Sequence, residues 1–123
     1  MPKSRVLVVE DDPNGQKITR ELLEYVDLDV DVVEDAEQAL NWLDDRDYAA
    51  AIIDLSLPGM TSWELLQHIQ QAPKTAELPC FAVTAYHTPQ IEQETIAAGF
   101  VAYFPKPLNF DTFFEEIRAR LAS

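Results

Sequence analysis

The sequence has little of several residue types that mark large classes of protein. Its 123 residues include one cysteine, Cys80, and only 3 glycines. A lone cysteine within an apolar run has no partner for a disulfide and fits a buried thiol in a reducing compartment. No apolar run approaches membrane-spanning length, and no apolar signal region follows the N-terminus. We therefore expect a cytoplasmic protein that forms a single domain over residues 1–123.

Basic residues are scarce as well. The chain has 9 Lys and Arg against 22 Asp and Glu, which gives a formal net charge of −13. Such a charge repels phosphate backbones and anionic lipid surfaces, so we expect neither direct nucleic-acid binding nor a membrane partner. Apolar residues, in contrast, make up 47% of the chain, which is enough to bury a core and to exclude a disordered protein.

Short apolar runs of the kind that forms buried parallel strands recur along the chain. They cover residues 5–9, 30–33, 48–53, 80–83 and 101–104. Segments with apolar residues at helical spacing lie between these runs and after the last one. Asp12 and Pro13 predict the start of the first helix, and Gly99 predicts the end of the fourth. Five strands alternating with five helices predict an α/β protein whose parallel sheet is covered on both faces.

The fifth helix has the clearest apolar stripe in the sequence. Its members are Phe110, Phe113, Phe114, Ile117 and Leu121. Charged residues lie mostly on the other side of this helix, so we expect the stripe to pack in the core and need no cofactor to explain it.

Polar side chains stand where four of the predicted strands end. Glu10 and Asp11 follow the first strand, Asp54 the third and Thr84 the fourth, and Lys106 lies shortly after the fifth. Ligands of an open parallel sheet bind beyond the carboxyl ends of its strands, so we expect these side chains to meet. Each of them alone has an ordinary explanation as a helix cap, a turn residue or a solvated charge. Their joint appearance at successive strand ends favours a functional site.

The residue types at this edge of the sheet suit phosphoryl transfer. Carboxylates held close together repel one another unless a hard cation lies among them, and Mg²⁺ prefers oxygen ligands. An aspartate can attack phosphorus to form an acyl phosphate, while the metal and a lysine neutralise the phosphoryl oxygens. We therefore predict that Asp54 is the nucleophile, that Lys106 binds the phosphoryl group, and that the nearby carboxylates hold the metal.

Four segments resemble the successive signatures of response regulator receiver domains of two-component signalling systems, such as the chemotaxis regulators. They are VLVVEDDP (6–13), IIDLSLPGM (52–60), VTA (83–85) and YFPKP (103–107), in the family's order. The resemblance implies a doubly wound, flavodoxin-like sheet of strand order 2-1-3-4-5. It also implies a signalling switch that is not an enzyme beyond catalysing its own phosphorylation and dephosphorylation.

The resemblance implies a phosphorylation site and a Mg²⁺ site on matching positions. Asp54 would receive the phosphoryl group from a sensor histidine kinase or a histidine phosphotransfer protein. Glu10 and Asp11 would bind Mg²⁺, Asp11 the more directly, and Asp54 and the backbone carbonyl of Ser56 would complete the protein ligands.

A switch mechanism is implied in the same way. Thr84 would bond a phosphoryl oxygen and Lys106 would pair with the phosphate, while Tyr103 would turn inward as the aromatic switch residue. The fourth helix, fifth strand and fifth helix would then form the face that binds a downstream protein target. The Lys106-Pro107 peptide bond is expected to be cis.

Two positions are specific to this chain. Ser62 stands near the start of the third helix where the family usually has glycine, and its backbone conformation should still be open to serine. Tyr86, two residues past Thr84, shares with Ser56 the positions that tune hydrolysis of the acyl phosphate in this family. We expect the bulky Tyr86 to shield the phosphate from water.

Three other readings fit the sequence less well. A flavodoxin-like electron carrier needs a glycine- and hydroxyl-rich phosphate loop after its first strand, where this chain has Glu10, Asp11 and Asp12. An aspartate-nucleophile phosphatase would carry a second acid two residues after the nucleophile, where this chain has Ser56. A receiver that folds without being phosphorylated would have no need of the acids, the threonine and the lysine together.

Overall fold

The computed structural model describes residues 4–121 and confirms the predicted alternation of strands and helices. Of the predicted domain over residues 1–123, residues 1–3 and 122–123 lie outside the described part. The strands are β1 (Arg5–Val9), β2 (Asp29–Val33), β3 (Ala50–Asp54), β4 (Cys80–Thr84) and β5 (Ala102–Pro105). The helices are α1 (Pro13–Tyr25), α2 (Ala36–Asp45), α3 (Ser62–Gln71), α4 (Pro89–Ala98) and α5 (Phe110–Leu121).

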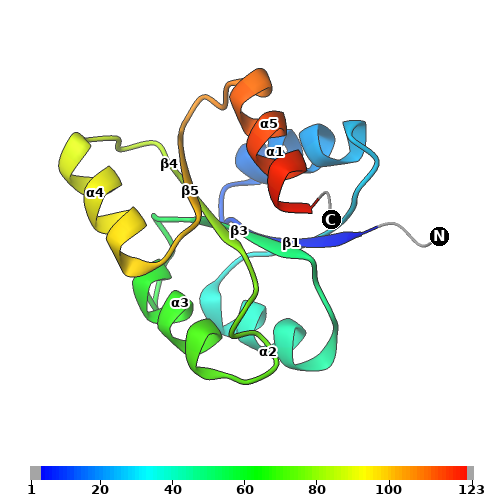
Figure 1. Cartoon of the computed structure of the whole chain (residues 1–123), viewed down its shortest axis with the longest axis vertical. Helices are drawn as coiled ribbons and strands as arrows, with labels where there is room; N and C mark the ends of the chain where they lie inside the picture. Colours follow the sequence, from blue (N-terminus) through cyan, green and yellow to red (C-terminus); the bar gives the residue numbers. More distant parts are fainter. Residues whose placement is uncertain (1–3, 122–123) are drawn as a thin grey trace.

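All neighbouring strands are parallel, and their order in the sheet is β2-β1-β3-β4-β5, as predicted. Helices α1 and α5 cover one side of this sheet and α2 and α3 cover the other, while α4 packs beside β5 (Figure 1). The strand order reverses between β1 and β3, which therefore point their carboxyl ends toward the crevice where ligands of such sheets bind. Within residues 4–121, no helix is both long and apolar enough to cross a bilayer.

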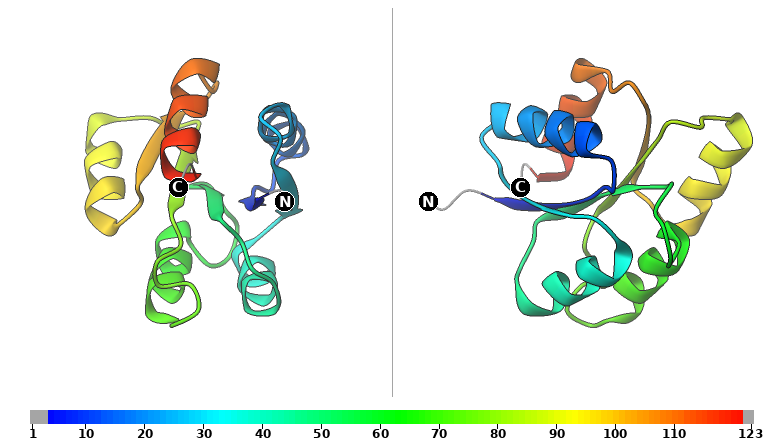
Figure 2. Two further views of the ribbon diagram at one scale, coloured as in Figure 1. Left: turned by 45° about the vertical axis from the view of Figure 1, so that its right-hand side comes forward. Right: turned by 180° about the vertical axis from the view of Figure 1, so that it is seen from behind.

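Helices lie on both faces of the sheet (Figure 2), and two layers of apolar side chains hold them there. They arise because successive residues of a strand point to opposite faces. The α1/α5 layer contains Val6, Val8, Ala50, Ile52, Phe81, Val83, Leu22, Leu23, Phe113 and Ile117. The α2/α3 layer contains Leu7, Val9, Ala51, Ile53, Ala82, Ala36, Ala39, Leu65, Leu66 and Ile69. Strands buried on both faces explain why the sequence shows continuous apolar runs instead of alternation.

The helix boundaries follow from local side chains. The Asp12 side chain accepts a hydrogen bond from the Gly15 N–H at 3.0 Å and caps α1, as predicted. Thr61 caps α3 through a reciprocal capping box with Glu64. Gly99, with a φ of 121°, ends α4 as predicted, because this backbone conformation is rarely open to side chains with a Cβ.

The predicted burial of the apolar stripe on α5 was partly wrong. Phe113 and Ile117 are fully buried, but Phe110 is 58% exposed. Phe110 is the first residue of α5, where periodicity alone cannot tell whether a position lies over the sheet or beyond it. Its ring instead stacks on Phe114 at a centroid distance of 6.0 Å, and Phe114 stacks on Tyr25 at 5.8 Å.

Cys80 is buried and free, as predicted. Burial raises the pKa of its thiol to about 12, so the group stays protonated and inert at neutral pH. The expected cis peptide bond between Lys106 and Pro107 is also present.

Candidate phosphoryl-transfer site

The carboxyl ends of β1 and β3 and the segment after β5 bring three of the predicted residues together. The Lys106 ammonium donates hydrogen bonds to Asp54 Oδ2, at 2.6 Å, and to Glu10 Oε1. Both carboxylates are almost fully buried, whereas the lysine side chain keeps 24% of its surface exposed. The fold thus gathers groups that are 96 and 52 residues apart in the chain around one partly open ammonium.

Backbone groups fix Asp54 in place. Its Oδ1 accepts a hydrogen bond from the Ser56 N–H at 2.6 Å, and the Leu55 N–H donates to Val83 O on β4 at 2.9 Å. The Lys106 N–H donates to Thr84 O at 2.8 Å, which ties the lysine to the end of the same neighbouring strand. The predicted nucleophile Asp54 and the lysine that faces it are therefore anchored through backbone hydrogen bonds at the ends of the strands.

The site carries two carboxylates against one ammonium. Burial raises the pKa of Glu10 to about 7, with the adjacent Asp54 adding to the shift and Lys106 opposing it. Burial also works to raise the pKa of Asp54, but Glu10, Lys106 and the Ser56 N–H together favour its charged form, so its pKa is lowered. Asp54 is thus the ionised member of the pair, as a nucleophile must be.

The carboxylate oxygens of this site are suited to binding a cation. Glu10 Oε2 is buried, and no hydrogen-bond partner for it is found among the described residues. A buried acid oxygen without a partner and a pKa near neutrality indicate a site short of positive charge. Asp11, the next residue, is exposed to solvent. Within residues 4–121, no three His, Cys, Asp or Glu side chains are already gathered as a metal-binding group, so the predicted ligand set remains a prediction.

The predicted switch residues lie at the neighbouring strand ends. Thr84 is buried, and its hydroxyl accepts a hydrogen bond from the Tyr86 N–H at 3.0 Å. Tyr103 is half-buried, and its hydroxyl is 2.8 Å from His87 Nδ1 in the loop after β4. Burial, followed by the charge of Glu92, raises the pKa of Tyr103.

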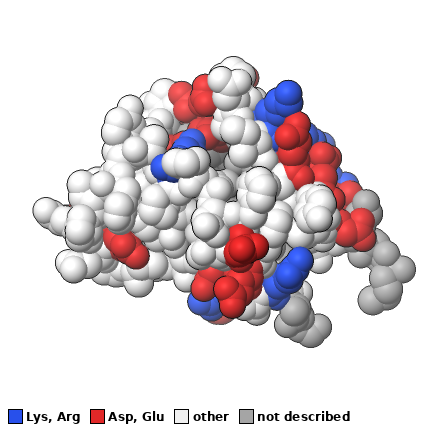
Figure 3. Space-filling model, turned by 90° about the horizontal axis from the view of Figure 1, so that it is seen from above, with Lys and Arg blue, Asp and Glu red and all other residues white. Residues whose placement is uncertain are grey.

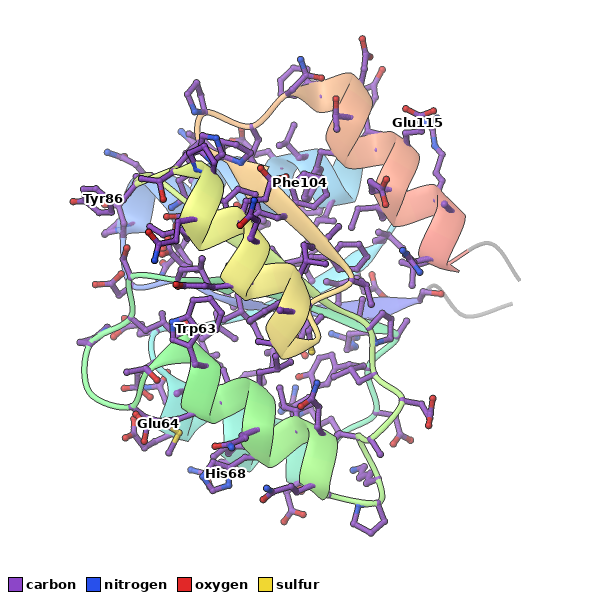
Figure 4. The ribbon with its side chains drawn as sticks, turned by 60° about the vertical axis from the view of Figure 1, so that its left-hand side comes forward. Trp63, Glu64, His68, Tyr86, Phe104 and Glu115 are labelled. Carbon is purple, nitrogen blue, oxygen red and sulfur yellow. The ribbon has the colours of Figure 1, made fainter. Side chains whose placement is uncertain are left out.

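Tyr86 is strongly exposed, with 71% of its surface open to solvent. Figure 4 shows its side chain at the outer rim of the molecule, at the end of the sheet where the site lies. Its predicted role as a shield over the phosphate remains a prediction.

Sequence reasoning missed three contacts at this site. The Ser62 hydroxyl donates a hydrogen bond to the backbone carbonyl of Asp54, and His87 binds Tyr103. Gly15 leaves room for the Glu10 side chain, because a Cβ at this position would lie only 2.8 Å from Glu10 Cδ. A glycine inside a helix was the one visible signal among these, since glycine there is otherwise unfavourable.

A hollow of about 680 Å³ opens beside the lysine, between α1 and the segment leading into α5. Lys106, Pro107, Gly15 and Ile18 are among its lining residues. Seen from above relative to Figure 1, acidic side chains form several separate groups within uncharged surface, and basic side chains lie beside some of these groups (Figure 3). Asp12 and Glu21 also line this hollow, so acidic side chains border the approach to Lys106.

Comparison with known proteins places the chain in a family. Residues 6–118 match the response regulator receiver domain family. An uncharacterised 14.6 kDa protein of Leptolyngbya boryana is 33% identical, over 85% of this chain and 79% of that protein. The two-component response regulator PhoP of Pseudomonas aeruginosa is 38% identical, over 75% of this chain but only 38% of PhoP. The chain thus spans well under half the length of that regulator.

A solved structure shows the same fold. It is the receiver domain of a sensor histidine kinase from Pseudomonas aeruginosa PAO1, determined with a magnesium ion coordinated in its active-site cleft. The TM-score is 0.90 with coverage of 99% of this chain and 100% of that one, at 23% sequence identity.

Proposed function

Because this chain belongs to the family of response regulator receiver domains, we propose that Asp54 accepts a phosphoryl group and that the modified domain changes its affinity for a protein target. The observation that carries the proposal is the hydrogen bond from Lys106 to the ionised, buried Asp54 carboxylate. An ammonium already placed against the nucleophile can neutralise incoming phosphoryl oxygens without further reorganisation.

The proposed reaction needs only Asp54 and a phosphoryl donor as reactants. An Asp54 carboxylate oxygen attacks phosphorus, and the bond from phosphorus to the donor's nitrogen or oxygen breaks, which leaves an acyl phosphate on Asp54. The donor's leaving group takes up a proton from solvent when it needs one. Lys106 stays within reach of the modified side chain and offsets its new charge, while the Ser56 N–H holds Asp54 Oδ1 in position.

The residues that would hold Mg²⁺ are Glu10, Asp11, Asp54 and the Ser56 carbonyl. The partnerless Glu10 Oε2 and the raised pKa of Glu10 support this set, and the related receiver with magnesium in its cleft is consistent with it. When bound, the ion would supply positive charge to the phosphoryl oxygens. In its absence, Lys106 provides the positive charge that faces both buried carboxylates.

The partners follow from this chemistry. The donor would be a sensor histidine kinase or a histidine phosphotransfer protein, and the hollow lined by Lys106 offers it a surface next to the site. The output would be a protein that reads the face formed by α4, β5 and α5. Thr84 and Tyr103 support this direction, because they connect the site to the loop that leads into α4.

The direct test is incubation with acetyl phosphate and Mg²⁺, followed by intact mass measurement. Wild type should gain one phosphate-sized mass that disappears in excess chelator, and Asp54→Asn should gain none. Asp12→Asn is a matched control, because it removes a neighbouring charge while keeping a good helix cap. Absence of the gain in wild type, or its persistence in Asp54→Asn, would contradict the proposal.

A further inference from the structure

Ser62 connects the start of α3 to the nucleophile. It is the first residue of this helix, its side chain is completely buried, and its hydroxyl donates a hydrogen bond to the backbone carbonyl of Asp54. The residue lies in an ordinary helical conformation, so serine fits the backbone here without strain. Glycine at this position could not donate such a bond, because it has no side-chain hydroxyl.

The Ser62 hydrogen bond brings both ends of a short loop against Asp54. Residues 55–61 leave β3 and return at α3, and the Ser56 N–H at the beginning of this loop donates to Asp54 Oδ1 at 2.6 Å. Ser62, directly after the loop, holds the carbonyl of the same residue. The side chain and the peptide of Asp54 are therefore fixed by two different points of one loop.

The start of α3 is rigid enough to act as an anchor. Thr61 Oγ1 accepts from the Glu64 N–H at 3.1 Å, and Glu64 returns a bond to the Thr61 N–H. Trp63 packs edge-on against Phe100 at a centroid distance of 6.0 Å, and Figure 4 shows it at the start of α3, on the side of α4. A hydroxyl carried on this turn can thus hold a strand end in a fixed place.

We propose that Ser62 is a positioning residue for phosphoryl transfer, which orients the Asp54 carboxylate toward Lys106 and holds the Ser56 peptide beside it. The inference rests on the proposed function and extends it to a residue that is not among the predicted phosphate-binding or metal-binding residues. Loss of the hydroxyl lets the Asp54 peptide rotate and weakens the alignment of its carboxylate. The effect falls on the rate of phosphorylation in addition to stability.

Another buried hydroxyl residue, at the other end of α3, offers a matched control. The Thr75 hydroxyl, just beyond the other end of α3, is also buried and donates to the Ile69 carbonyl at 2.7 Å. Thr75→Val and Ser62→Ala each remove one buried hydroxyl that bonds a backbone carbonyl. A purely structural role for Ser62 would make the two variants behave alike.

The experiment compares wild type, Ser62→Ala, Ser62→Gly and Thr75→Val in phosphorylation by acetyl phosphate at saturating Mg²⁺, with urea unfolding of each. Both Ser62 variants should phosphorylate about 2–10-fold more slowly, as expected for the loss of one hydrogen bond that aligns the reacting group. Thr75→Val should keep the wild-type rate although its stability falls. The amide resonance of Ser56 should shift in the Ser62 variants and stay in place in Thr75→Val.

The outcomes separate this inference from the proposed function. If wild type is not phosphorylated, the proposed function itself fails. If wild type is phosphorylated and the Ser62 variants match its rate, or Thr75→Val slows as much as they do, only the positioning role is overturned. Because Ser62→Gly adds no bulk and Ser62→Ala keeps helix propensity, a folding defect in one leaves the other to decide.

Discussion

Replacing Gly15 by alanine should destabilise the protein, although the same change in most helices stabilises. A helical glycine is ordinarily less favourable than alanine by about 0.5–1 kcal/mol. Here a Cβ would lie 2.8 Å from Glu10 Cδ and 3.1 Å from Cγ, and closer still to Oε1. Glu10 has little freedom to withdraw, because it is buried and its Oε1 is bonded by Lys106.

The size of the effect follows from two opposing terms. Overpacking a filled site destabilises by about 1–3 kcal/mol, and the gain in helix propensity of about 0.5–1 kcal/mol reduces this to a net loss of about 0–2.5 kcal/mol. The free energy of unfolding is measured by urea titration in the presence of a chelator, with an unchanged m-value as the check on two-state behaviour. Asn14→Ala, at the exposed neighbouring position of the same first turn, controls for general effects on α1.

A second substitution tests the cause directly. Glu10→Ala removes the Cγ, Cδ and carboxylate oxygens that the new Cβ would meet. In this background, Gly15→Ala should become stabilising, so that the double-mutant cycle gives a coupling energy of about 1–3 kcal/mol. A stabilising Gly15→Ala in the wild-type background, or the same effect in both backgrounds, would refute the reasoning.

Three further predictions concern other parts of the structure. Lys106→Met leaves two buried carboxylates without their ammonium, and we expect chelator-treated protein to lose about 3–5 kcal/mol of unfolding free energy at pH 8, with partial recovery on adding Mg²⁺; an unchanged urea midpoint would contradict this. His87→Phe keeps a ring beside Tyr103 but removes its hydrogen bond, so the fluorine resonance of fluorotyrosine at position 103 should shift, and an identical spectrum would exclude the contact. The pKa of Cys80 is raised from 9.0 to about 12, so unfolding releases a proton above pH 9. Its contribution to stability is complete below pH 9 and is lost as the pH rises toward 12, at about 1.4 kcal/mol per pH unit. Urea unfolding between pH 9 and 11 should therefore show a shallower decline in Cys80→Ala than in wild type.

The sheet and the centre of the site could be predicted from the sequence because both depend on order along the chain. Apolar runs gave the strands, and parallel topology then required their carboxyl ends to share one edge. Glu10, Asp54 and Lys106 meet for that reason, whatever the details of side-chain packing. The expectation that Asp12 caps α1 held because it depends on neighbours within one turn.

The contacts that the sequence did not predict depend on how separate elements are placed in space, which the spacing of apolar residues does not reveal. Ser62 reaches the Asp54 carbonyl because the first turn of α3 lies next to the end of β3. His87 meets Tyr103 because the loop after β4 folds over β5. Phe110 shows the opposite failure, since its place in an apolar stripe could not reveal that the helix begins beyond the sheet.

The register of the sheet has a consequence for how a signal could travel. Asp54 is paired with Val83, which belongs to the α1/α5 layer, whereas Tyr103 is paired with Ala82 of the α2/α3 layer. The proposed acceptor Asp54 and the proposed switch residue Tyr103 thus lie on opposite faces of the sheet. Conformational coupling between these two residues would therefore pass around the carboxyl-terminal edge of the sheet, through Thr84 and the loop after it. Substitutions in the two apolar layers would then affect mainly stability, and substitutions at Thr84 and in the loop after it would affect mainly the switch.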